Sequence, residues 1–137
     1  MRVAIALRAG FGALILGWAG GALADAAQAP ELVALTKLER GQWELKPLGE
    51  RGPARRICLG DPRALLQLRH VGEAGCSRFI IANDARTATV HYTCPGAGHG
   101  RTTVTVTTPR ALRIETQGIA DNAPFDVAFE ARRTGGC

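Results

Sequence analysis

Apolar and polar residues alternate with a period of two along most of the second half of the chain. In residues 87–94, alanine, valine, tyrosine and cysteine alternate with threonine and histidine, and the alternation recurs in residues 112–116 and 125–132. Residues 102–108 consist almost entirely of threonine and valine, which favour extended structure. Because successive side chains of a strand point to opposite faces, these four segments are predicted to be half-buried strands.

The first half of the chain mixes shorter strands with helices. Residues 42–46 alternate around Trp43, and residues 54–59 and 78–82 read as two further short strands. The helical spacing of leucines 32, 35 and 38 before Gly41 predicts a helix over 31–39. A second helix is predicted over 62–70.

The start of the second helix has a clear sequence signature. Asp61 is a good N-cap, and Pro62 follows at the first helical position, where its missing N–H costs nothing. Turn signals separate the short strands at intervals of about 8–12 residues, which is typical of antiparallel sheets. We therefore expect a mostly β fold with some α+β character: a single curved antiparallel sheet or half-open barrel with one or two short helices, braced by disulfides.

The N-terminus has the pattern of a secretory signal peptide. Arg2 and Arg8 precede an uncharged, largely apolar stretch, and Ala22-Leu23-Ala24 is a small-x-small cleavage site before Asp25. The uncharged stretch is shorter than the roughly 20 residues that span a bilayer, which disfavours a permanent anchor. We expect residues 1–24 to be removed, leaving one domain over 25–137 in the periplasm and no transmembrane segment.

The number and spacing of basic residues disfavour a nucleic-acid partner. The formal net charge of the whole chain is +5, and the predicted leader carries two of the basic residues. The others are scattered, with adjacent pairs only at Arg55-Arg56 and Arg132-Arg133. A nucleic-acid platform needs a basic stripe interleaved with exposed aromatic side chains, so we expect no nucleic-acid partner.

The four cysteines, Cys58, Cys76, Cys94 and Cys137, lie in the predicted mature domain. An even number in a small exported chain predicts two disulfides. Of the three possible connectivities we favour Cys58–Cys76 and Cys94–Cys137. Zinc binding by His91, Cys94, His99 and Cys76 is the alternative, but the close Cys-Cys spacing of structural zinc sites is absent, so we expect no metal and no cofactor.

The glycine-rich segment 95–101 is the most unusual stretch. It would present backbone donors, His99 and Arg101 to an anion, or simply form a glycine-permitted hairpin turn, which we favour. Ser77 is the only serine and lacks the flanking glycines of a nucleophile elbow, so it is expected to be structural. A hydrolase that uses His91 and His99 remains a weaker alternative.

A family resemblance rests on several of these features together. Gly41-x-Trp43-Glu44, the cysteines that follow and the strand-rich C-terminal half resemble the exported bacterial proteins of domain-of-unknown-function family 3617. The resemblance covers most of residues 35–137. It implies a periplasmic protein without an assigned activity and assigns no catalytic residue to this chain.

The pair Gly41 and Trp43 is also similar to the Gly-x-Trp opening of lipocalin barrels, which implies that Trp43 lies near a barrel floor. Residues 25–137 are few for a barrel of about eight strands, so a smaller curved sheet is expected. A role for Trp43 as a core anchor is the simpler alternative, and we favour it.

These patterns favour a non-enzymatic module that binds a small apolar or amphipathic ligand, or an envelope protein, against one face of the sheet. The candidate ligand-binding residues are Trp43, Tyr92, His99 and Arg101. No catalytic residue is assigned. The alternative from a different class is a structural envelope accessory protein that acts through protein contacts.

Overall fold

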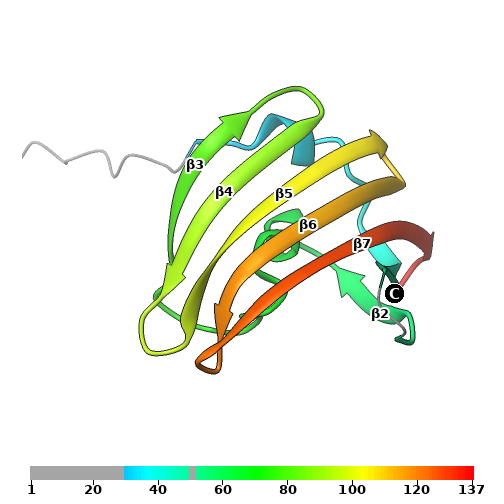
Figure 1. The fold of residues 1–137 in the computed structure, drawn as a ribbon. Coiled ribbons are helices and arrows are strands. Elements are labelled where there is room, and N and C mark those ends of the chain that lie inside the picture. The colour runs from blue at the N-terminus through cyan, green and yellow to red at the C-terminus, as the bar shows by residue number, and fades with distance from the viewer. Residues whose placement is uncertain (1–29, 50–51) are drawn as a thin grey trace, which may run out of the picture.

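Seven antiparallel strands form one continuous, curved sheet in the computed structural model, which describes residues 30–49 and 52–137 (Figure 1). The spatial order is β2-β1-β7-β6-β5-β4-β3. The strands are β1 (Gly41–Leu48), β2 (Arg55–Leu59), β3 (Ser77–Asn83), β4 (Thr87–Cys94), β5 (Gly98–Thr108), β6 (Ala111–Ala120) and β7 (Ala123–Gly135). The predicted mostly β, antiparallel fold is confirmed, and the sheet is open, with β2 and β3 at its edges. The predicted leader, 1–24, lies outside the described residues.

Strands β3 to β7 follow one another through tight turns, and β7 then pairs with β1. The β6–β7 turn is built on Asp121 and Asn122, whose φ angles of 52° and 62° are those of a two-residue hairpin loop. Asx side chains tolerate this left-handed backbone better than most. The return of β7 to β1 places the N-terminal strand inside the sheet and leaves β2 at the edge.

Two short 3-10 helices replace the two longer helices that the sequence predicted. They are η1 (Val33–Leu35) and η2 (Pro62–Gln67), and Figure 1 shows η2 crossing one face of the sheet. The predicted cap is confirmed, because the Asp61 side chain accepts a hydrogen bond of 2.9 Å from the Arg63 backbone N–H. The leucines at 32, 35 and 38 are three residues apart, a spacing that suits the three residues per turn of a 3-10 segment as well as an α-helix.

The core lies between the concave face of the sheet and these 3-10 helices. Trp43, Leu45, Leu65 and Leu66 are among its fully buried members. The indole N–H of Trp43 donates a hydrogen bond of 3.0 Å to the Glu39 carbonyl, so its one polar atom is satisfied. The simpler prediction for Trp43, a core anchor, is therefore confirmed.

Gly41 precedes this anchor at a crowded point of the sheet. Its φ angle is +137°, and a Cβ atom there would lie 2.3 Å from the carbonyl oxygen of Gly135 on β7. A side chain at this position would push β1 away from β7. The Gly-x-Trp pattern therefore combines a close strand approach with a core anchor.

The two predicted disulfides are confirmed, but the favoured pairing was wrong. The bonds are Cys58–Cys137 and Cys76–Cys94. Cys58 on β2 pairs with Gln42 on β1, which in turn pairs with Gly135 on β7, so the C-terminus passes close to Cys58. Sequence spacing misled here because it cannot show that β1 lies between β2 and β7.

The second disulfide follows from local register. Ser77 pairs with Thr93, which places the preceding Cys76 beside Cys94 at a Cα–Cα distance of 4.2 Å. This bond closes the open end of the β3–β4 pair. Within residues 30–49 and 52–137, no helix has the length and apolar character needed to cross a membrane.

Candidate functional site

An open groove of about 1000 Å³ lies between the β3–β4 edge of the sheet and the two 3-10 helices. It exists because the sheet does not close: β3 has no neighbouring strand on its outer side. The helices η1 and η2 contribute to the walls of this space. The apolar lining residues are Leu32, Leu35, Leu38, Leu66, Phe79, Ile80 and Val90, together with Pro30 and Pro62.

The floor of the groove is part of the hydrophobic core. Leu66 and Val90 are fully buried, and Leu35 is 4% exposed. Ile80 on β3 is partly buried and packs against the same cluster, opposite Val90 in the strand register. The floor is therefore apolar and held by packing on several elements. The apolar side chains that a ligand can reach are those of half-buried Ile80 and of Phe79, which is 70% exposed.

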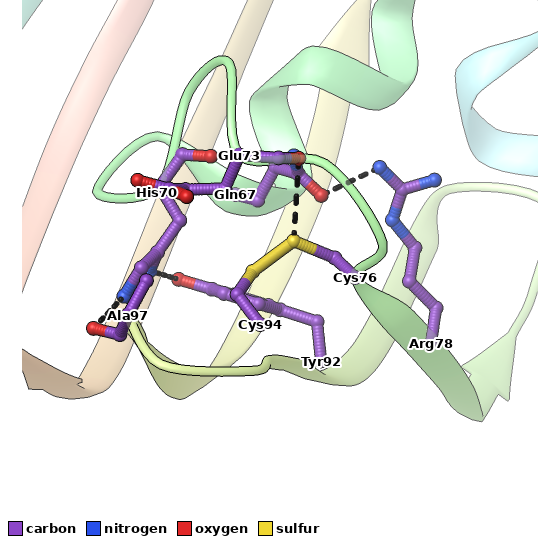
Figure 2. Close-up of a disulfide and its surroundings, with 8 residues drawn as sticks. All are labelled: Gln67, His70, Glu73, Cys76, Arg78, Tyr92, Cys94 and Ala97. Atoms are coloured by element: carbon purple, nitrogen blue, oxygen red, sulfur yellow. Dashed lines mark hydrogen bonds between the residues drawn. A yellow bond between two sulfur atoms is a disulfide. The ribbon is translucent and has the colours of Figure 1, made fainter.

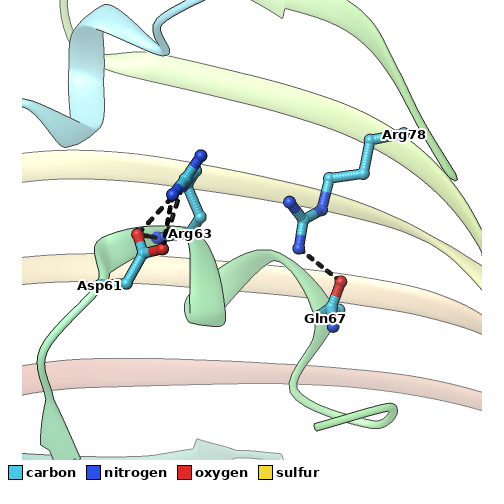
Figure 3. A network of polar contacts seen from close by, with 4 residues as sticks. All are labelled: Asp61, Arg63, Gln67 and Arg78. Atoms are coloured by element: carbon cyan, nitrogen blue, oxygen red, sulfur yellow. Dashed lines mark hydrogen bonds and ion pairs between the residues drawn. The ribbon is translucent and has the colours of Figure 1, made fainter. Parts of the chain in front are cut away.

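The rim of the groove is polar and carries two fixed arginines (Figure 3). Asp61 accepts hydrogen bonds from Nε and Nη2 of Arg63 at 2.9–3.1 Å. Arg78 Nη2 donates a hydrogen bond of 2.6 Å to Gln67 Oε1. The Arg63 hydrogen bonds lower the pKa of the Asp61 carboxyl, and the charge of Arg78 lowers it further.

A buried hydrogen-bonded network lies beside the groove (Figure 2). His70 is 4% exposed; its Nδ1 atom lies 2.9 Å from the Tyr92 hydroxyl, and its Nε2 atom lies 3.1 Å from the Ala97 carbonyl oxygen. Gln67 Nε2 donates to the His70 carbonyl at 3.4 Å, which links this network to Arg78 on the rim. The network therefore ties the rim to the β4–β5 turn.

The glycines of segment 95–101 make room for this network. A Cβ atom on Gly98 would lie 2.9 Å from His70 Nε2, and one on Gly100 would lie 2.6 Å from the Tyr92 hydroxyl. The segment forms the β4–β5 hairpin turn, as the favoured interpretation predicted. Gly98 and Gly100 leave room for His70 and Tyr92, and Gly98 also lies against the Ile119 carbonyl of β6.

The four ligand-binding candidates from the sequence do not gather in one place. Trp43 and Tyr92 are fully buried in the interior, whereas His99 and Arg101 are exposed on the convex face. None of the four lines the groove. Tyr92 is linked to the rim through His70, Gln67 and Arg78.

Sequence reasoning missed the groove residues Arg63, Arg78 and Ile80. The signal for Arg63 was present in part, because the Asp61 cap two residues earlier placed it in the first turn of the helix. No local pattern marked Arg78, whose position depends on β3 being an edge strand.

His91 and His99 lie on neighbouring strands with ring centroids 5.7 Å apart, and both are exposed. In the described part of the chain, no hydrogen bond joins Ser77 to either histidine. Over those same residues, no group of three or more His, Cys, Asp or Glu side chains is placed to hold a metal ion.

We compared the chain with protein-family models, with curated proteins and with solved structures, and none of them matches.

Proposed function

We propose that this protein is a non-enzymatic periplasmic module that binds a small apolar or amphipathic ligand in the groove beside β3. The observation that carries the proposal is the groove itself, with its floor of leucine, isoleucine and valine side chains. Its volume of about 1000 Å³ is at the upper end of the range of small-molecule sites.

The proposal combines this apolar floor with a polar rim. Ligand sites are commonly lined by apolar side chains, with a few placed polar groups that set orientation. Here the rim offers Arg63 and Arg78, both held by hydrogen bonds. An apolar chain on the floor with its polar end at the rim suits this arrangement.

The periplasmic location is supported by the two disulfides, since such bonds persist in oxidising compartments. The leader-like N-terminus and the resemblance to exported family 3617 agree with it. Native mass spectrometry of protein recovered from the periplasm tests it: we expect residues 25–137 with four fewer hydrogens. Extra mass that is lost on denaturation would reveal a bound ligand.

Binding is tested with a neutral apolar dye, N-phenyl-1-naphthylamine, followed by its fluorescence. We expect saturable binding to the wild type and its loss in Ile80→Glu, which places a charge on the groove floor. Ile81→Glu is the matched control, because Ile81 is the next residue on the same strand, is 45% exposed and does not line the groove.

Ile80 packs against the core, so thermal unfolding is measured for both variants. If Ile80→Glu does not fold, Thr36→Trp, an exposed position on the groove wall, takes its place. Equal dye binding by wild type and a folded groove variant would refute the proposal.

A second candidate, an accessory protein that acts through protein contacts, is favoured by one observation. Phe79 and Ile81 on the edge strand β3 are 70% and 45% exposed. Neighbouring apolar side chains on an unpaired edge are a common docking feature. Because Phe79 also lines the groove and Ile81 does not, Ile81→Ser is the variant that separates the two candidates. Failure of dye binding, together with self-association that Ile81→Ser abolishes, would favour this candidate over the groove.

A further inference from the structure

The charged side chains on the groove rim do not balance. Three arginines, Arg40, Arg63 and Arg78, line the groove with only two acidic residues, Glu31 and Asp61. Arg63 and Asp61 form an ion pair with an N–O distance of 2.9 Å, so the Asp61 charge is already matched. The remaining lining charge is positive.

Arg78 is the arginine best placed to present its positive charge to a ligand in the groove. Arg78 pairs with Tyr92 of the neighbouring strand β4, which is a buried residue on the concave face. Arg78 therefore lies on the same face as Ile80 of the groove floor. The guanidinium donates to the neutral carboxamide of Gln67, a contact that leaves other N–H donors available. Among residues 30–49 and 52–137, Arg78 forms no ion pair.

The guanidinium is also held in place. Gln67 contacts Arg78 through Oε1 and the His70 carbonyl through Nε2, so its carboxamide is fixed at both ends. Figures 2 and 3 show the same contact from the disulfide side and from the rim. A donor group held before the ligand arrives loses less side-chain entropy on binding.

We propose that the ligand of the groove is an anionic amphiphile, whose acidic head group binds Arg78 while its apolar chain packs on the apolar floor of the groove. This inference rests on the proposed function and adds the charge of the ligand. Carboxylate and phosphate heads share the required chemistry, because both accept paired hydrogen bonds from a guanidinium.

The test compares amphiphiles that have the same chain and different heads: decanoate, decyl phosphate and decyltrimethylammonium. Displacement of the neutral dye measures their affinities below their micelle-forming concentrations. We expect both anions to bind about tenfold more tightly than the cation, a difference of about 1.4 kcal/mol, since only the anions accept charge-assisted hydrogen bonds from Arg78. The ratio of decanoate to decyl phosphate affinity identifies the preferred head.

Arg78→Gln is expected to weaken anion binding about tenfold; the dye affinity of each variant is measured first, so that the displacement constants are corrected for it. Arg132→Gln is the matched control, since it removes the same charge from an exposed position that does not line the groove. Equal losses in both variants would show that only net charge matters and would overturn the assignment to Arg78.

The two proposals fail in different ways. If the dye binds but anions and cations compete equally, the groove function stands and the charge inference is wrong. If neither dye nor amphiphile binds to folded wild-type protein, both are wrong.

Discussion

The Tyr92 hydroxyl and the Nδ1 atom of His70 lie 2.9 Å apart in the protein interior. The other ring nitrogen faces the Ala97 carbonyl oxygen, which can only accept a hydrogen bond, so Nε2 carries the proton. In the tautomer with its proton on Nε2, Nδ1 accepts a hydrogen bond from the tyrosine hydroxyl. This single arrangement satisfies both side chains, and no buried side-chain nitrogen or oxygen in the described residues lacks a partner.

Removing the hydroxyl leaves a buried acceptor without its donor. We expect Tyr92→Phe to lower the free energy of unfolding by about 1–3 kcal/mol, measured by urea denaturation. The same substitution in a His70→Ala background should cost clearly less, because the acceptor is absent there. An equal cost in both backgrounds would show that the hydrogen bond is unimportant.

The glycine at position 100 is expected to be required by the Tyr92 ring. Gly100→Ala would place a Cβ atom 2.6 Å from the Tyr92 hydroxyl, so we expect a loss of about 1–3 kcal/mol from overpacking. Gly60→Ala is the control, because nothing lies within 4 Å of a Cβ atom there. Thermal unfolding should show a lower melting temperature for Gly100→Ala than for Gly60→Ala. Indistinguishable melting temperatures would contradict the proposed crowding at Gly100.

Burial raises the pKa of the Tyr92 hydroxyl above its ordinary value, although the charge of Arg69 opposes this. The neutral form is therefore favoured in the folded state. Stability from this group is fully present below about pH 10, where unfolded tyrosine titrates, and is lost as the pH rises through the higher folded pKa.

The chain contains one tyrosine, so ultraviolet absorbance of tyrosinate reports Tyr92 alone. We expect its midpoint in folded protein to lie above the midpoint in urea. The alkaline loss of stability should be smaller in Tyr92→Phe. Coincident folded and unfolded midpoints would contradict the effect of burial.

The disulfide pairing predicts a defined peptide map. Trypsin cleavage after arginine, without reduction, should give residues 57–63 linked to 134–137 and residues 70–78 linked to 87–101. Mass spectrometry before and after reduction detects these linked peptides. A peptide linking Cys58 to Cys76 would instead support the pairing that sequence spacing favoured.

The two bonds should also contribute unequally to stability. Their sequence separations are 79 and 18 residues, and on the chain-entropy model these correspond to about 4.5 and 3 kcal/mol. We expect Cys58→Ala/Cys137→Ala to be destabilised more than Cys76→Ala/Cys94→Ala in urea denaturation. The reverse order would show that native-state packing around buried Cys94 outweighs loop entropy.

Local patterns in the sequence determined most of the strands. Alternation located β4, β6 and β7, and the Asp61-Pro62 pair located the start of η2, because side-chain periodicity and capping depend on neighbouring residues. The fold class and the presence of two disulfides also followed from sequence, through turn spacing and an even cysteine count. The leader and the family resemblance remain predictions.

Tertiary structure alone decided which distant residues meet. The insertion of β1 between β2 and β7 brought Cys58 to Cys137. The open β3 edge brought Arg78 to the rim of a groove that no local sequence pattern predicts. Tyr92 was singled out from the sequence, but its contact with His70, 22 residues away, required η2 to cross the sheet. Periodicity fixes the face on which a side chain lies, whereas strand order and chain crossings depend on burial summed over the whole core.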